Sequence, residues 1–182
     1  MVDVVLTADD IEKLLTALES ALRRKGSEGR IFIVGGAAMV LAYNAGRSTG
    51  DIDGVMQPRE VVLDAAREVA ATYGLPQNWL SDGVLQMHMP PRADDHPLSR
   101  RIGPALTIEI ASAEYVLAMK AMSTRLSDGD LKDAARLCAM LGFTDEAEIE
   151  AVIRRYYGSA DVFGAQELWF ERIIAAAAEG DF

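Results

Sequence analysis

The chain has 182 residues, of which 50% are hydrophobic, and its formal net charge is −10. This combination indicates one folded domain of ordinary size, excludes a disordered chain and argues against a general nucleic-acid coat protein, although a local basic patch can still dock one RNA. The single cysteine excludes an internal disulfide, and the lack of a signal-like N-terminus or a membrane-length apolar run predicts a cytoplasmic protein without a membrane partner.

The first half of the sequence predicts alternating helices and strands. Thr7 is a candidate N-cap for a first helix, because apolar residues recur after it at helical spacing until Gly26. The Gly35-Gly36 pair predicts a turn after the first strand, and Pro58 predicts the start of a later helix. The expected strands are 30–34 and 51–56, antiparallel or mixed, and the expected further helices are 37–46 and 59–74.

The second half predicts a long loop followed by helices. Residues 89–104 contain four of the six prolines and no apolar periodicity, which is typical of a functional loop. Ser112 and Thr144 are candidate N-caps. The expected strands are 84–89 and 105–112, and the expected helices are 113–126, 128–142, 145–158 and 165–178.

This order of elements predicts an α/β fold of the α+β kind. A small mixed β-sheet flanked by helices is expected over about 1–111, and a helical part over about 112–182. Both parts are expected to belong to a single domain, because the chain is no longer than one domain of ordinary size. Cys138, Trp79 and Trp169 are expected in the core or at an interface.

Asp51 and Asp53 stand one residue apart at the start of the second expected strand. Residues i and i+2 of a strand point to the same face, about 6.5 Å apart along the backbone, so both carboxylates can converge on one or two divalent cations. The alternative is a strand start at which Ile52 is buried and both acids are solvated. The Gly35-Gly36 pair favours the first interpretation, because glycines between a strand and a helix let the backbone approach a phosphate.

This arrangement resembles the signature of the DNA polymerase β-type nucleotidyltransferases, in which a Gly-Gly or Gly-Ser precedes a strand-borne Asp-x-Asp. Here 14 residues separate Gly36 from Asp51, and the carboxylates stand in the sequence Arg-x-Thr-x-Asp-Ile-Asp. Gly54 departs from the pattern, since the superfamily prefers an apolar residue at that position. The resemblance implies a nucleotide site formed by Gly35, Gly36, Arg47 and Thr49. It also implies a site for Mg²⁺ or Mn²⁺ formed by Asp51 and Asp53.

The C-terminal half resembles the small bacterial nucleotidyltransferase-like proteins related to AbiEii toxins. In those proteins a strand leads into a helix bearing a lysine, followed by an arginine and by an Asp-x-x-Asp pair that opens the next helix. The matching residues are Lys120, Arg125, Asp130 and Asp133. The resemblance implies that Lys120 meets the nucleotide phosphates, whereas its apolar neighbours alone favour a lysine whose stem packs on the core.

Two residues compete for the role of a third carboxylate. Asp133 lies a full turn inside its helix, where the helix dipole does not explain it, and the resemblance implies that it positions Lys120 or the incoming nucleophile. Glu109 alternates with Ile108 and Ile110 in a strand. In many superfamily members a neighbouring strand supplies the third metal ligand, so Glu109 is the alternative.

The resemblance implies transfer of a nucleotidyl group from an NTP to an acceptor, with tRNA as a candidate acceptor and a separately encoded antitoxin as a candidate partner. The main alternative is a catalytically inactive module of the same fold that binds a nucleotide or a protein. A metal-dependent hydrolase that uses His88 and His96 is weaker, because these residues have neither helical spacing nor cysteine support. The loop 89–104 also contains Arg92, Arg100 and Arg101, which either contact phosphates or are solvated.

Overall fold

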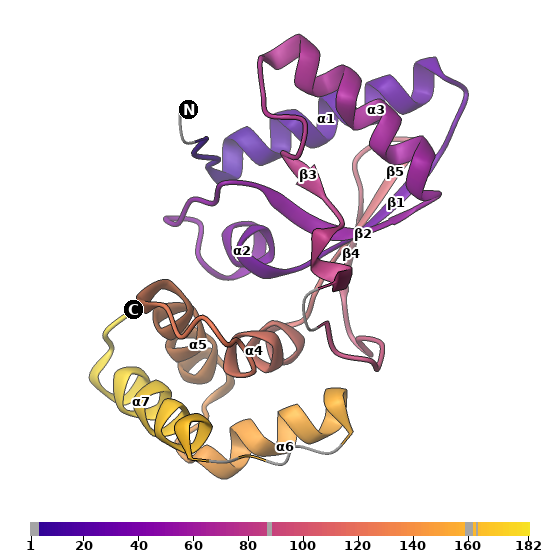
Figure 1. Ribbon diagram of the computed structural model, residues 1–182. Helices are drawn as coiled ribbons and strands as arrows, with labels where there is room; N and C mark the ends of the chain where they lie inside the picture. The colour runs from indigo at the N-terminus through magenta and orange to yellow at the C-terminus, as the bar shows by residue number, and fades with distance from the viewer. Residues whose placement is uncertain (1–3, 87–88, 159–161, 163) are drawn as a thin grey trace. The chain divides into compact units, whose positions relative to one another are not determined.

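A computed structural model describes residues 4–86, 89–158, 162 and 164–182 of the chain (Figure 1). The chain forms two compact units, the first comprising residues 1–87 and 97–111 and the second residues 88–96 and 112–182. The division at residue 111 coincides with the expected end of the mixed α/β part. Residues 88–96 depart from that expectation, because this piece of the proline-rich loop belongs to the helical unit.

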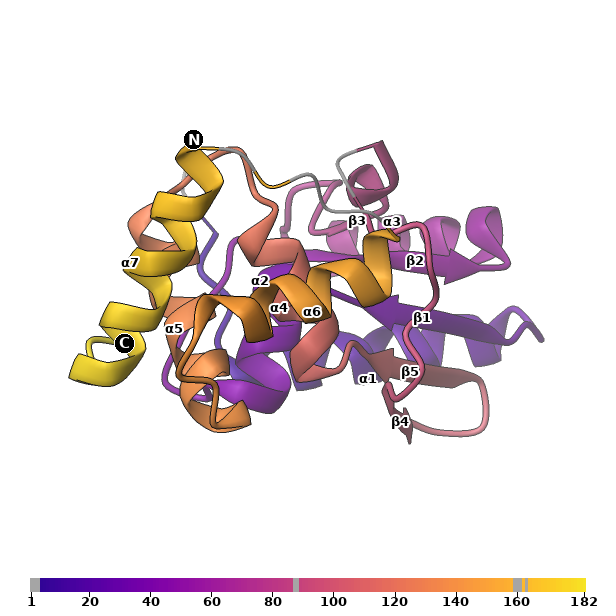
Figure 2. The ribbon, with the colours of Figure 1, turned by 90° about the horizontal axis from the view of Figure 1, so that it is seen from below.

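The first unit is built on a five-stranded mixed sheet in the order β3-β2-β1-β5-β4, which confirms the predicted α/β fold class (Figure 2). The central strand β1 pairs antiparallel with β2 and parallel with β5. The strands are β1 (Gly29–Ile33), β2 (Ile52–Gln57), β3 (Leu80–Ser81), β4 (Leu98–Arg101) and β5 (Leu106–Ile110). The helices are α1 (Ala8–Arg24), α2 (Gly35–Ala38), which continues into a π-helical turn (Met39–Tyr43), α3 (Arg59–Tyr73) and a 3₁₀ turn (Gly83–Gln86).

One face of this sheet carries the core. Alternate residues of β1, β2 and β5, such as Ile31, Ile52 and Ile108, are fully buried. Helices α1 and α3 lie side by side over this face (Figure 1). Gly29 of β1 permits the close approach of α3 to the sheet, because a Cβ at this position would lie 2.7 Å from Val62 Cγ2. The residues between these positions point to the opposite face, on which the predicted carboxylates lie.

Two of the three N-caps predicted from the sequence are confirmed. Thr7 forms a capping box with Asp10 at α1, and the Ser112 hydroxyl accepts a hydrogen bond from the Tyr115 amide at the next helix. The prediction that Thr144 caps a helix was wrong, because Asp145 is the N-cap and forms a capping box with Glu148. Asp and Thr both suit the position, so the sequence alone left a one-residue ambiguity.

Two other predictions needed correction in the middle of the chain. The expected strand 84–89 is a 3₁₀ turn over Gly83–Gln86, while Met87 and His88 lie outside the described residues. The expected loop 89–104 contains strand β4, which pairs antiparallel with β5 at the edge of the sheet. All four β4 residues are exposed, so this strand has no apolar alternation by which to recognise it.

The second unit is helical, as expected. Its helices are α4 (Ala113–Ala121), α5 (Asp128–Leu141), α6 (Glu146–Tyr157) and α7 (Ala165–Glu179). Helix α4 packs against both α5 and α6, and α7 packs along α5 (Figure 1). The expected helix 113–126 ends five residues early, at Ala121. Trp169 and Cys138 lie in the core of this unit, and Trp79 lies in the core of the first.

The segment of the proline-rich loop in the second unit ties two of its helices together. Arg92 donates from its guanidinium to the Arg155 carbonyl at 2.9 Å, at the C-terminal end of α6. Asp94 accepts hydrogen bonds from the Ser112 amide at 2.6 Å and from the Ser112 hydroxyl at 2.8 Å, at the start of α4. Arg92 therefore caps a helix rather than standing in a solvated loop, because helix C-termini favour cations.

Candidate nucleotide and metal site

The residue before the glycine pair lies beside the backbone of Asp53 at the C-terminal end of β1. Helix α2 begins at Gly35 directly after this strand, so the pair forms the first helical turn rather than a separate turn. Gly35 has φ +61°, a conformation that glycine adopts without strain. The Val34 amide, immediately before the pair, donates to the Asp53 carbonyl at 3.0 Å. The structure thus brings together Gly35, Gly36 and Asp53, which lie far apart in the sequence.

Asp51 and Asp53 occupy the start of β2. Asp51 immediately precedes the strand, and Asp53 is its second residue. Both are partly exposed, whereas the intervening Ile52 is buried, so the alternation expected from the sequence is confirmed. Asp53 therefore lies on the sheet face opposite α1 and α3.

Arg47 and Thr49 lie in the loop that joins the π-helical turn to β2, against the glycine pair. A Cβ built on Gly36 would lie 2.7 Å from Thr49 Oγ1 and 4.0 Å from an Arg47 guanidinium nitrogen. The Thr49 hydroxyl donates to the Asp51 carbonyl at 3.2 Å. Six of the residues that the sequence assigns to the nucleotide and metal sites thus lie in the first unit, whereas Lys120, also assigned to the nucleotide, belongs to the second.

Glu109 shares the sheet face of Asp53 but not its neighbourhood. It lies on β5, opposite Phe32 of β1, so the whole of β1 separates it from β2. Its carboxylate lies 3.6 Å from an Arg30 guanidinium nitrogen. Glu109 lies opposite Phe32 of β1. Arg30 lies before Phe32 on this strand, whereas Val34, the neighbour of Asp53, lies after it. The ion pair with Arg30 therefore directs the Glu109 carboxylate away from Asp53.

The donor set fits a magnesium ion that also binds phosphate. Among the described residues, no group of three or more His, Cys, Asp or Glu side chains is placed to hold a metal. Mg²⁺, however, is commonly bound through one or two carboxylates together with substrate phosphates and water. Asp51 and Asp53 could supply those carboxylates, and a Cβ at Gly35 would meet no atom within 4 Å, so the turn is open at this residue. The residues present therefore fit a metal that arrives with its nucleotide.

Gly54, the departure from the superfamily pattern, has a packing explanation. A Cβ at this position would lie 2.5 Å from the Phe32 carbonyl oxygen and 3.1 Å from Ile31 Cγ2. The first contact is with backbone, which cannot move aside as a flexible side chain can. Close pairing of β2 with β1 therefore requires a glycine here, and the departure is compatible with the proposed site.

Lys120 and Asp133, the two predicted residues in the second unit, form a buried ionic cluster with Asp130. The Lys120 ammonium lies 2.6 Å from an Asp130 oxygen and 2.9 Å from an Asp133 oxygen. All three residues are buried. The hydroxyl of Ser127, the N-cap of α5, also donates to Asp130 at 2.9 Å. The cluster therefore fixes the last turn of α4 to the first two turns of α5.

Asp130 matches the Asp-x-x-Asp pair in the sequence, but no role in the site was predicted for it. Its backbone amide is capped by Ser127, and its carboxylate binds Lys120. Burial by itself raises the pKa of Asp130, yet the hydrogen bond and the charge of Lys120 outweigh burial and hold that pKa below its usual value. The signal in the sequence that could have indicated this contact is the short connection between α4 and α5. A short connection makes the end of one helix and the start of the next neighbours in space.

The other arginines and the described histidine of the proline-rich loop make contacts within the protein. Arg100 pairs with Glu12 of α1 at 2.6 Å. Arg101 donates to the Pro104 carbonyl at 2.7 Å. The His96 amide donates to an Asp94 carboxylate oxygen at 3.1 Å, the side-chain-to-backbone contact of a turn. These contacts favour a structural reading of the loop over phosphate binding.

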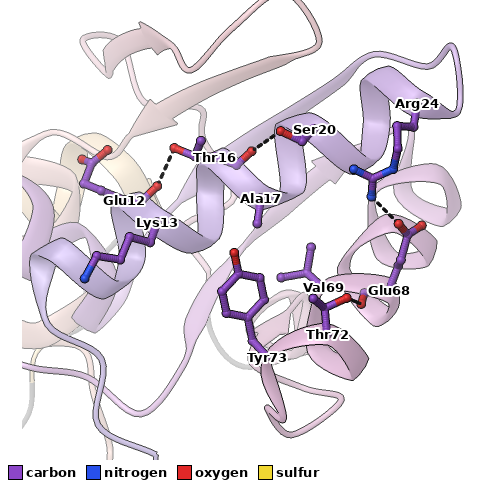
Figure 3. Close-up of a pocket in the computed structure, with 10 residues that line it drawn as sticks. All are labelled: Glu12, Lys13, Thr16, Ala17, Ser20, Arg24, Glu68, Val69, Thr72 and Tyr73. Carbon is purple, nitrogen blue, oxygen red and sulfur yellow. Dashed lines mark hydrogen bonds and ion pairs between the residues drawn. The ribbon is translucent and has the colours of Figure 1, made fainter.

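A groove of about 530 Å³ lies elsewhere on the first unit, between α1 and α3 (Figure 3). Tyr73 projects into it, and the ion pair of Arg24 and Glu68 closes one end. The Thr16 and Ser20 hydroxyls that line it donate to carbonyls of their own helix. None of the predicted nucleotide or metal residues lines this groove.

The contact between Gly36 and Thr49 yields a stability prediction. We expect Gly36→Ala to lower the free energy of unfolding by about 1–3 kcal/mol, because the new methyl group overlaps the Thr49 hydroxyl. Thr49→Ala in the same chain should recover at least about 0.5 kcal/mol of that loss, as expected for residues in contact. Urea unfolding followed by the fluorescence of Trp79, in a Trp169→Phe background, measures both. Strict additivity of the two substitutions would show that the side chains do not interact.

Comparison of the chain with protein-family models, with curated proteins and with solved structures gave no match at all. A search for membrane spans found no helix of sufficient length and apolarity within the part of the chain that the structure describes. Any proposal of function therefore rests on the residues themselves, and above all on the hydrogen bond between Val34 and Asp53.

Proposed function

We propose that the protein is a metal-dependent nucleotidyltransferase that moves a nucleotidyl group from an NTP to an acceptor. One observation carries the proposal, namely the hydrogen bond that joins the residue before the Gly35-Gly36 pair to Asp53. This contact supports the proposal, because it holds the backbone before the glycine pair next to the strand that carries Asp53. Phosphoryl and nucleotidyl transfers depend mainly on such positioning and on charge neutralisation.

Each residue of the first unit has a role in this proposal. The backbone of Gly35 and Gly36 binds the triphosphate, because the first N–H groups of a helix have no intrahelical partner. Arg47 lies against the same turn and neutralises phosphate charge. Asp51 and Asp53 hold Mg²⁺ or Mn²⁺, which when bound neutralises the charge that develops on the phosphate during transfer.

Lys120 has a different role from the one that the resemblance implies. Its side chain is only 9% exposed, and its charge already faces Asp130 and Asp133. A phosphate would have to compete with two buried carboxylates. We therefore assign Lys120 and Asp133 to the stability of the helical unit and leave the nucleotide to the residues of the first unit.

The acceptor proposed for the first test is tRNA, and the resemblance that suggests it also suggests a toxin with a protein antitoxin as partner. Each NTP, labelled at its α-phosphate, would be incubated with the protein, Mg²⁺ and total tRNA. We expect label to enter tRNA, and Asp51→Asn to lower the rate at least about a hundredfold, because a metal's charge stabilisation is worth several kcal/mol. Asp128→Asn, an exposed acid on α5, is the matched control and should retain the activity. Transfer that survives Asp51→Asn would contradict the metal site.

A second measurement tests the metal without activity. Binding of Mg²⁺ should raise the melting temperature of the wild type, because a ligand that binds only the folded state stabilises it. Asp53→Asn should remove this response, since it replaces one of the two carboxylates proposed to hold the metal. An equal Mg²⁺ response in both proteins would show that the acids are merely solvated.

A nucleotide-binding module without catalysis is the second candidate. The observation that favours it is the position of Glu109, which pairs with Arg30 and is separated from Asp53 by β1. Nucleotide binding without transfer to any acceptor would select this reading. Loss of transfer in Glu109→Gln would instead show that Glu109 acts as the third carboxylate.

A further inference from the structure

The segment before α1 is attached to the loop that carries Thr49. Leu6 and Thr49 form an isolated antiparallel β-bridge, in which the Leu6 amide donates to the Thr49 carbonyl at 2.7 Å and the Thr49 amide donates to the Leu6 carbonyl at 3.0 Å. Leu6 is only 3% exposed, and Thr7, the next residue, caps α1. The loop backbone is therefore fixed to a buried residue at the start of a capped helix.

The Thr49 side chain lies between the two halves of the proposed site. Its hydroxyl donates to the Asp51 carbonyl at 3.2 Å, and it packs against Gly36 so closely that a Cβ there would lie 2.7 Å from Thr49 Oγ1. A threonine hydroxyl has one hydrogen to donate. Because that hydrogen is donated to the Asp51 carbonyl, the Thr49 hydroxyl oxygen can only accept further hydrogen bonds. A phosphate oxygen is also an acceptor, so the hydroxyl is unsuited to bind it.

We infer that Thr49 is a positioning residue, held by Leu6, that sets the distance between the Gly35-Gly36 turn and the Asp51 and Asp53 carboxylates. This inference rests on the proposed function and changes the role of Thr49 within it, since the resemblance makes Thr49 a nucleotide ligand. Leu6 then acts on the metal site through the bridge, without touching metal or nucleotide.

Metal binding in the absence of nucleotide separates these roles. Titration of the wild type, Thr49→Ser and Thr49→Val with Mn²⁺ alone would give the three dissociation constants. We expect Thr49→Val to weaken Mn²⁺ binding about three- to tenfold, the effect of one hydrogen bond, and Thr49→Ser to stay within about twofold of the wild type. A residue that binds only phosphate leaves Mn²⁺ binding unchanged in all three proteins.

A second pair of variants tests the bridge. Leu6→Ala should weaken Mn²⁺ binding as Thr49→Val does, whereas Val5→Ala, at a neighbouring position that is 63% exposed, should not. Hydrogen exchange of the Leu6 and Thr49 amides in the wild type needs no variant and must be slow if the bridge forms.

The outcomes are distinguishable. Equal Mn²⁺ affinity in wild type and Thr49→Val, or fast exchange of both bridge amides, overturns the inference and leaves the proposed function intact. Weaker NTP binding by Thr49→Val with unchanged Mn²⁺ affinity overturns it in favour of a direct nucleotide contact. A wild type that binds neither Mn²⁺ nor an NTP overturns the proposed function itself, and the inference with it.

Discussion

Replacement of Lys120 by methionine should lower the free energy of unfolding of the helical unit by about 3–5 kcal/mol. The methionine keeps the length and apolar stem of the side chain but removes the charge between Asp130 and Asp133. Both carboxylates are buried, so each would remain without the cation that lies 2.6 Å and 2.9 Å away in the wild type. Removal of one partner from a buried ion pair is strongly destabilising, because the remaining charge stays buried without its main counter-charge.

Urea unfolding followed by Trp169 fluorescence measures this loss in the helical unit, in a Trp79→Phe background. Lys132→Met on α5 is the matched control, because its side chain is 58% exposed and lies 3.9 Å from Asp181. A surface pair of this kind contributes at most about 1 kcal/mol. Equal losses in the two variants would show that the Lys120 cluster is not the source of stability.

The loss in Lys120→Met should also depend on pH. The lowered pKa of Asp130 in the wild type means that its carboxylate stabilises the fold fully above the unfolded pKa, about 3.9, and that this contribution is lost as the pH falls through the lower folded pKa. Without Lys120, burial is opposed only by the Ser127 hydrogen bond and the Arg125 charge. We therefore expect a higher pKa of Asp130 in the variant than in the wild type, and protonation of this carboxyl should reduce the destabilisation at acidic pH. The difference between wild type and variant should therefore be largest at neutral pH and smaller near pH 4. A difference that is independent of pH would contradict the ionic origin of the effect.

Replacement of Gly54 by alanine should cost about 3 kcal/mol, the upper end of the range for overpacked positions. The added methyl group would lie 2.5 Å from the Phe32 carbonyl oxygen, so β1 and β2 would have to separate locally. The Val34–Asp53 hydrogen bond lies at the same end of the strand pair. We therefore expect weaker Mg²⁺-dependent stabilisation in this variant, in addition to the loss of stability.

Gly46→Ala is the control for this substitution. A Cβ at Gly46 would lie 3.6 Å from the nearest atom, Asn44 Oδ1, which is ordinary contact, and the residue is exposed. Its effect should stay within about 0.5 kcal/mol. Urea unfolding followed by Trp79 fluorescence compares the two. A tolerated Gly54→Ala would mean that the glycine departs from the superfamily pattern for a reason other than packing against β1.

The sequence by itself determined the features that depend on near neighbours along the chain. The N-cap at Thr7, the alternation of Ile52 between Asp51 and Asp53, and the apolar strand before Gly35 were all predicted, because capping and alternation are set by residues within about four positions. The mixed sheet and the helical C-terminal part followed from the order of these elements. Both candidate halves of the proposed site were named from such signals.

Only the tertiary structure decided which of these residues meet. The pairing of β1 with β2 joins Val34 to Asp53, the Leu6 bridge holds Thr49, and the packing of α4 on α5 gives Lys120 two carboxylate partners. It also revealed β4, whose exposed residues carry no apolar pattern. The physical reason is common to all of these contacts. They arise when elements that bury their apolar faces also bring distant polar groups together. Hydrophobic burial is non-directional, so local sequence patterns show which residues are buried but not which polar groups become neighbours.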